Sequence, residues 1–301
     1  MTWKPAGIIP ALITPFDSSQ QLDEAALRRL VRRLAASGVH GLFGLGTNGE
    51  FFSLTESEKL RAAEIMMEEA GGLPVYIGAG CAATHETIRL ARQLERLGAD
   101  ALTVITPYFL SFTQQELIGH FRAVAAATSL PILLYNIPAR TGNALAPKTV
   151  GELSRIPNIV GIKDSSGSYD TILQYLEHAG PEFAVLAGTD SLILSTLMAG
   201  GQGAVAATAN VFPETVRSIY ELWQQGRLAE AEQQQRKLRA LRSAFALGTL
   251  PSVLKEAMNR IGLPAGLPRL PVQPLGPDAR AELYAVMDRY LAEGMQPQAG
   301  A

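Results

Sequence analysis

The chain of 301 residues has a single cysteine, only four histidines and a net charge of -2. One cysteine excludes an internal disulfide framework and is typical of a reducing compartment, so we expect a cytoplasmic protein. The histidines are far apart and match no metal-binding spacing. The small net charge gives no reason to expect nucleic acid or an anionic membrane as a partner. No run of about 18 apolar residues is present to span a membrane.

Short apolar runs alternate with helical patterns along most of the chain. Eight of these runs are apolar without alternation, which is typical of parallel strands covered on both faces. Their rhythm predicts a (β/α)₈ barrel, with a doubly wound sheet as the alternative. We expect the barrel to occupy residues 1–226 and a helical appendage packed on it to occupy residues 227–301. The eight runs are 7–13, 41–45, 74–78, 101–105, 131–135, 159–163, 184–187 and 203–206.

Helix-start signals lie between these strands. Asp23 is expected to cap the first helix, while Thr55 with Glu58 and Thr113 with Glu116 form capping boxes. After the last strand the pattern is helical throughout, apart from a proline-rich link. The predicted C-terminal helices are 214–225, 228–247, 252–261 and 278–293.

Lys163 ends the otherwise apolar run 159–163. A charged amine at the edge of a core is costly unless it is paired or used. Desolvation favours the neutral amine, which can attack a ketone and form a Schiff base. The alternative is a lysine whose amine reaches water from a buried stem. In a (β/α)₈ barrel the active site lies at the carboxyl ends of the strands, where Thr47 and Tyr135 also fall. We therefore expect these three residues to meet.

Glycines 44, 46 and 49 match the literal form of a dinucleotide-binding fingerprint. They follow the second predicted strand rather than the first, and residues 50–54 separate them from the next helix, which argues against a nucleotide. A turn whose backbone N–H groups bind a carboxylate is the better interpretation. A turn that merely requires glycine remains the alternative.

Three segments together resemble the signature of the dihydrodipicolinate synthase/N-acetylneuraminate lyase family. They read GTNGE at 46–50, YNIPARTG at 135–142 and GIKD at 161–164, in matching order and spacing. The resemblance implies a (β/α)₈ barrel with C-terminal helices and a homotetramer built as a pair of dimers. It implies class I aldolase chemistry on pyruvate or another 2-oxo acid, with no cofactor and no metal.

The resemblance also implies catalytic roles. Lys163 forms the Schiff base, the phenol of Tyr135 is the general acid–base, and the hydroxyl of Thr47 relays protons. Two nearby acids are not expected to act. Strand alternation turns Asp164 away from Lys163, and we expect Asp190 to cap the next helix.

Substrate-binding roles follow from the same resemblance. The amides of Thr47 and Asn48 hold the pyruvate carboxylate, Val205 lies against pyruvate, and Gly188 borders the distal half of the substrate. Arg140 presents a guanidinium fork that can take a second carboxylate. Its alternative role is a structural ion pair in the loop.

Two positions depart from the synthase pattern. Asn48 replaces a second threonine, and Phe109 replaces the second of two tyrosines, the one that reaches across the dimer and completes the proton relay. These changes favour an aldolase or dehydratase for 4-hydroxy-2-oxo acids or 2-keto-3-deoxy sugar acids, with a small aldehyde as second substrate.

Two other functions stay open. One is 4-hydroxy-tetrahydrodipicolinate synthase, which joins pyruvate to aspartate semialdehyde, and Arg140 favours it. The other is a non-catalytic protein that binds 2-oxo acids. Such a protein is expected to lose the lysine or the tyrosine, whereas Lys163 and Tyr135 are both present.

Overall fold

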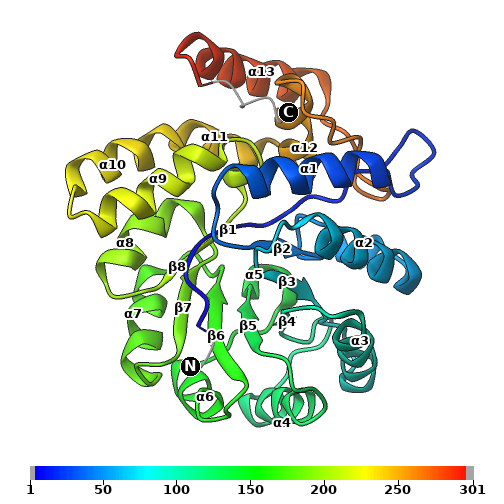
Figure 1. The fold of residues 1–301 in the computed structure, drawn as a ribbon, viewed down its shortest axis with the longest axis vertical. Helices are drawn as coiled ribbons and strands as arrows, with labels where there is room; N and C mark the ends of the chain where they lie inside the picture. The colour runs from blue at the N-terminus through cyan, green and yellow to red at the C-terminus, as the bar shows by residue number, and fades with distance from the viewer. Residues whose placement is uncertain (1–3, 296–301) are drawn as a thin grey trace.

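The computed structural model describes residues 4–295. Eight parallel strands form one sheet in the order β1-β8-β7-β6-β5-β4-β3-β2. Ala11, just past β1, bridges to Phe43 of β2, and the N–H of Leu12 donates to the Phe43 carbonyl over 2.9 Å. These contacts join the two outer strands, so the predicted (β/α)₈ barrel is confirmed (Figure 1). The strands are β1 (Gly7–Pro10), β2 (Leu42–Gly44), β3 (Val75–Gly78), β4 (Ala101–Ile105), β5 (Ile132–Asn136), β6 (Ile159–Asp164), β7 (Ala184–Ala187) and β8 (Gly203–Ala206).

All eight strands lie where the apolar runs predict them, and nearly every strand residue is buried. Continuous burial is expected when side chains fill the barrel on one face and meet helices on the other. The boundaries agree with prediction to within one residue, except at the end of the first strand. The first strand ends at Pro10 rather than at residue 13, and β6 continues one residue past Lys163 to Asp164.

The helices around the barrel begin at the predicted caps. The carboxylate of Asp23 accepts the N–H of Ala26 over 2.8 Å, and both predicted capping boxes are present. No helix within residues 4–295 is long and apolar enough to cross a membrane. The helices are α1 (Glu24–Ala36), α2 (Glu56–Glu69), α3 (Thr84–Leu97), α4 (Gln114–Ala125), α5 (Pro138–Thr141), α6 (Pro147–Leu153), α7 (Tyr169–His178), α8 (Ile193–Met198) and α9 (Pro213–Gln224), with 3₁₀ turns η1 (Phe51–Ser53), η2 (Asp190–Leu192) and η3 (Thr208–Asn210).

The single helix predicted over 228–247 is wrong, because the structure divides it. At Leu238 the N–H turns to the carbonyl of Gln235, three residues back, over 3.3 Å. The buried side chain of Gln235 donates to the carbonyl of Asp190 and accepts the N–H of Leu194, and we attribute the division to this anchoring on the barrel. The C-terminal elements are α10 (Leu228–Lys237), α11 (Arg239–Ala244), η4 (Phe245–Leu247), α12 (Ser252–Arg260) and α13 (Pro277–Ala292).

The C-terminal helices α10 to α13 gather on one side of the barrel, beside α1 (Figure 1). Buried residues of α11, α12 and α13 belong to the same hydrophobic cluster as the strands. The hydroxyl of Tyr290 on α13 donates to the carbonyl of Lys237 over 2.6 Å and ties this group together. The division into a barrel at 1–226 and an appendage at 227–301 stays a prediction.

Candidate functional site

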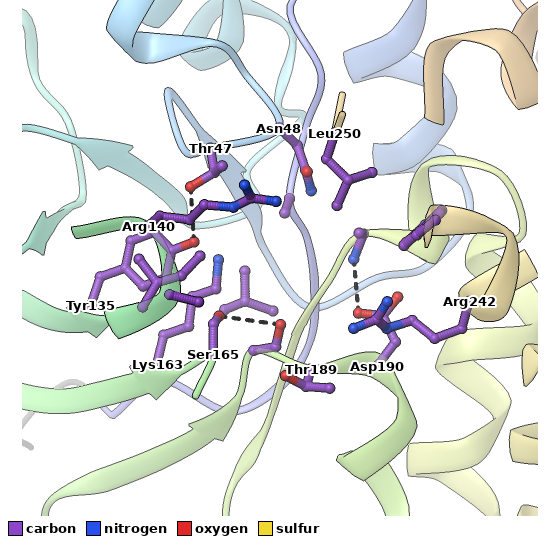
Figure 2. A pocket seen from close by; sticks show the side chains of 17 residues that line it. Thr47, Asn48, Tyr135, Arg140, Lys163, Ser165, Thr189, Asp190, Arg242 and Leu250 are labelled. Carbon is purple, nitrogen blue, oxygen red and sulfur yellow. Dashed lines mark hydrogen bonds between the residues drawn. The ribbon is translucent and has the colours of Figure 1, made fainter. Parts of the chain in front are cut away.

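A cavity of about 220 Å³ opens at the carboxyl ends of the strands. Its walls come from the ends of β5, β6 and β8, from the turns after β2 and β7, and from the C-terminal helices (Figure 2). The structure therefore brings together residues that are far apart in sequence. All seven predicted site residues line this cavity: Thr47, Asn48, Tyr135, Arg140, Lys163, Gly188 and Val205.

Lys163 is 4% exposed. Its Nζ lies 4.0 Å from the ring centre of Tyr135 and 4.7 Å from that of Phe43. No carboxylate of residues 4–295 lies within 4.0 Å of this amine. Tyr135 stands directly beside Lys163 in the register of β5 and β6. The burial does not fit a lysine that reaches bulk water. The amine is instead desolvated between aromatic faces at the cavity wall.

The phenol of Tyr135 and the hydroxyl of Thr47 lie 3.1 Å apart, and either can donate (Figure 2). Tyr135 is 3% exposed, so its hydroxyl reaches solvent only through the cavity. A phenol next to an amine and hydrogen-bonded to a second hydroxyl is a chain along which a proton can move.

The turn after β2 is shaped by close packing and by two strained residues. Leu45 and Glu50 have left-handed φ values of 57° and 52°. A Cβ on Gly46 would lie 2.6 Å from a ring carbon of Phe43, so only glycine fits there. The N–H groups of Thr47 and Asn48 donate to no acceptor within residues 4–295. The close packing at Gly46 is expected of either interpretation of this turn, whereas the free N–H groups are what a carboxylate-binding concavity requires.

A buried ion pair holds this turn from behind. The Glu50 carboxylate lies 2.6 Å from the Lys255 amine of α12, and both side chains are fully buried. The N–H of Arg269 donates to the same carboxylate over 2.9 Å. Burial lowers the pKa of Lys255, and the charge of Glu50 opposes that shift. Sequence reasoning missed this pair, although Glu50 is part of the GTNGE segment.

Arg140 extends from α5 at the edge of the cavity and is exposed. Its guanidinium has no carboxylate within 4.0 Å among the described residues. The alternative of a structural ion pair is therefore not supported, and the guanidinium fork is free to take an anion.

Asp164 does not line the cavity and is 1% exposed. Its carboxylate accepts from the Asn136 amide over 2.7 Å and from the Ser166 hydroxyl over 2.6 Å. Burial raises the pKa of this carboxyl. The prediction that Asp164 turns away from Lys163 is consistent with this placement.

Asp190 was expected to cap the helix that follows it, and this prediction is wrong. Its carboxylate accepts the N–H groups of Ala207 and Thr208 over 3.2 and 2.7 Å. The side chain therefore caps η3, the turn after β8, while it also lines the cavity. The two N–H groups fix the end of the strand that carries Val205.

Several cavity residues escaped sequence reasoning. Ser165 lies two residues after Lys163, and this spacing could have predicted that it lines the same cavity. Arg242 on α11, Phe245 in η4 and Leu250 in the turn before α12 belong to no motif. Within residues 4–295, no group of three or more His, Cys, Asp or Glu side chains is placed to hold a metal ion.

Phe109, which replaces a tyrosine of the synthase pattern, lies in the loop after β4. Phe109 is 93% exposed at a left-handed φ of 87°. Tyr108 is half-buried, with its ring centre 6.1 Å from that of Phe51, and burial raises its pKa. Neither residue lines the cavity. Within the described chain, Thr47 is thus the hydroxyl that Tyr135 meets.

Comparison with known proteins gives consistent matches over nearly the whole chain. The sequence model described as "Dihydrodipicolinate synthetase family" matches residues 4–289. A 4-hydroxy-tetrahydrodipicolinate synthase of Methanopyrus kandleri is 38% identical, covering 98% of each chain. One of Phenylobacterium zucineum is 40% identical, covering 93% of this chain and 96% of the relative. The structure of YagE from E. coli K12, solved with pyruvate, has a TM-score of 0.91 and 34% identity, and the match covers 94% of this chain and 98% of YagE.

Proposed function

This chain belongs to the dihydrodipicolinate synthase family of lyases, and from that premise we propose that it makes or cleaves a carbon–carbon bond at pyruvate through a Schiff base on Lys163. The observation that carries the proposal is the buried, unpaired amine of Lys163 at the cavity wall, 4.0 Å from the ring of Tyr135. An amine in this position can attack the ketone carbon of a substrate bound in the cavity.

The chemistry proceeds in four steps. The Lys163 amine attacks the ketone carbon of pyruvate, and loss of water gives an iminium. Loss of a proton from the methyl carbon then gives an enamine. The enamine carbon bonds to the aldehyde carbon of the second substrate. Water finally releases the product, and each step in reverse cleaves an aldol. Tyr135 exchanges the protons, and Thr47 passes them along the 3.1 Å contact.

The remaining walls bind and orient the substrates. The free N–H groups of Thr47 and Asn48 take the pyruvate carboxylate, while Val205 lies against pyruvate. Gly188 borders the distal half of the substrate, and a Cβ there would lie 2.1 Å from the Ser165 hydroxyl, so a larger residue would displace that cavity side chain. Arg140 takes a carboxylate on that substrate.

We propose aspartate semialdehyde as the leading second substrate. The relatives named 4-hydroxy-tetrahydrodipicolinate synthase support it better than they support the aldolase or dehydratase favoured by the sequence motifs. The unpaired guanidinium of Arg140 supports it as well.

The second candidate is an aldolase or dehydratase for 4-hydroxy-2-oxo acids or 2-keto-3-deoxy sugar acids. Phe109 favours it, because an exposed ring without a hydroxyl cannot extend a proton relay. In either case we propose a cytoplasmic homotetramer, as the family resemblance and the single cysteine imply.

The test is to incubate the protein with pyruvate and borohydride and to map the adduct by mass spectrometry. We expect one reduced adduct, on Lys163, and none on Lys255, the fully buried lysine outside the cavity. A folded sample without an adduct on Lys163 contradicts the proposal. A panel of aspartate semialdehyde, glyoxylate and glyceraldehyde then identifies the second substrate. Turnover confined to aspartate semialdehyde excludes the aldolase alternative.

A further inference from the structure

The C-terminal helices supply part of the cavity wall. Arg242 on α11, Phe245 in η4 and Leu250 all line the cavity, although none belongs to the strand-end loops that carry the other side chains. In Figure 2, Arg242 enters beside Asp190, on the side of the cavity away from Arg140. The cavity therefore has two arginines on different walls.

The guanidinium of Arg242 is uncommitted. Its carbon lies 5.5 Å from the ring centre of Phe245, which holds the group by a cation–π contact. Among residues 4–295 it has no carboxylate within 4.0 Å. By contrast, Arg236 and Arg239 nearby both reach Glu232, at 2.8 and 2.9 Å. A half-buried arginine that is positioned but unpaired retains its capacity for a bidentate anion contact.

The charges around the cavity also indicate an anionic substrate. Arg140 and Arg242 contribute positive groups, and the iminium that Lys163 forms with pyruvate adds a third, whereas Asp190 is the one acid among the lining residues of the described chain. The carboxylate of Asp190 already accepts two backbone N–H groups. The walls thus carry an excess of positive charge beyond what the pyruvate carboxylate requires, which favours a second anionic group in the substrate.

We propose that Arg242 is a specificity-determining residue that binds an acid group at the distal end of the aldehyde substrate. This inference rests on the proposed function and narrows it. The second substrate is an aldehyde that carries a carboxylate, rather than a neutral sugar-like aldehyde. Arg140 approaches the acid group from the β5 side, and Arg242 approaches it from α11.

The experiment compares Arg242→Gln with wild type, using pyruvate together with aspartate semialdehyde, glyoxylate or glyceraldehyde. We expect the KM for the acidic aldehyde to rise about 10- to 100-fold, the effect of one charge-assisted hydrogen-bond pair, with a much smaller change in kcat. The KM for pyruvate, the borohydride-trapped adduct on Lys163 and the KM for glyceraldehyde should not change.

Two further variants separate charge from structure. Arg242→Lys keeps the charge but loses the planar fork, so it should recover only part of the affinity for the acidic aldehyde. Arg239→Gln removes an exposed arginine of the same helix that is paired with Glu232. It should leave every KM at the wild-type value.

The outcomes distinguish this inference from the function on which it rests. A normal pyruvate adduct combined with an unchanged KM for the acidic aldehydes in Arg242→Gln overturns the role of Arg242 alone. Wild-type turnover of glyceraldehyde but of neither acidic aldehyde also overturns it. Absence of the adduct in wild type overturns the proposed function, and the inference with it.

Discussion

Lys163 and Lys255 are both buried, with 4% and 0% exposure, and each amine lies over an aromatic ring, at 4.0 Å from Tyr135 and 4.3 Å from Phe16. They differ in their polar partners. Lys255 lies 2.6 Å from Glu50 and donates to the carbonyl of Leu267 over 2.9 Å. Lys163 has no such carboxylate among residues 4–295 and lies at the wall of a cavity.

The difference shows what burial means for a lysine. A buried amine with a carboxylate and a carbonyl is satisfied, so its charge serves to hold two chain segments together. A buried amine without either has no polar partner to offset the cost of its desolvation. That cost is understandable if the amine reacts with a substrate, since functional sites often retain groups that destabilise the fold.

The largest effect is expected from removing the amine at the cavity. Lys163→Ala should lower turnover by about 10⁵-fold or more, as loss of a covalent nucleophile does in other enzymes. Its free energy of unfolding should stay near the wild-type value, because the packing lost with the buried stem is offset by removal of an amine that has no polar partner. Steady-state kinetics and denaturant unfolding measure the two quantities. Substantial residual turnover through pyruvate would place the nucleophile elsewhere.

Tyr135→Phe removes only the phenolic oxygen beside Lys163. We expect turnover to fall by about 10²–10⁴-fold, because each step requires a proton transfer. Tyr175→Phe is the matched control. Tyr175 is also buried, but its hydroxyl donates to the carbonyl of Leu145 over 2.6 Å and does not line the cavity. That variant should lose about 1 kcal/mol of stability and keep its activity. Equal rates for the two variants would remove Tyr135 from the mechanism.

Lys255, the lysine paired with Glu50, should matter for stability more than for turnover. Lys255→Met leaves Glu50 buried without its partner, so we expect a loss of about 3–5 kcal/mol in the free energy of unfolding. The double variant Glu50→Gln/Lys255→Met removes both charges and should recover part of that loss. Arg260→Met breaks the exposed pair with Asp288, at 2.6 Å, and should cost less than about 1 kcal/mol.

The kinetics of Lys255→Met test whether the ion pair also supports the carboxylate-binding turn. Glu50 lies two residues after Asn48 in the same turn, so a loosened Glu50 should raise the KM for pyruvate in Lys255→Met. The Lys163 adduct should still form at saturating pyruvate. If stability falls while the KM for pyruvate does not change, the pair holds the fold but not the carboxylate-binding turn.

The sequence predicts those features of the fold and the site that depend on residues close together in the chain. Apolar runs locate the strands, and the position of Lys163 at a strand end is enough to place it at the mouth of a barrel. Capping boxes are equally local, since Thr55 and Glu58 are three residues apart. Such features need no knowledge of distant contacts.

The features that were missed depend on long-range packing. Nothing near Lys255 in the sequence indicates that its partner is Glu50, because the pair forms only when α12 docks behind the turn. The division at Leu238 depends in the same way on what Gln235 contacts across the barrel. Arg242 reaches the cavity only because α11 lies over it.

His120 extends the comparison to a third buried base and gives the smallest expected effect. It is 5% exposed on α4, with Nδ1 3.0 Å from the Thr84 hydroxyl, and its Nε2 has no partner among residues 4–295. Burial lowers its pKa from 6.5 to about 4. The unfolded chain therefore binds the proton first. The contribution of neutral His120 to stability is complete above pH 6.5 and is lost as the pH falls from about 6.5 to about 4.

Denaturant unfolding at pH 7 and pH 5 tests this expectation. Between pH 7 and pH 5 the free energy of unfolding of wild type should fall by about 2 kcal/mol more than that of His120→Gln, whose side chain does not titrate. His85→Gln replaces an exposed histidine and should keep the wild-type pH dependence. Lys255 differs from His120 because the Glu50 carboxylate lies beside its amine and stabilises the charged form. Equal pH dependence in wild type and His120→Gln would mean that a buried base without an acid partner can remain charged in this fold.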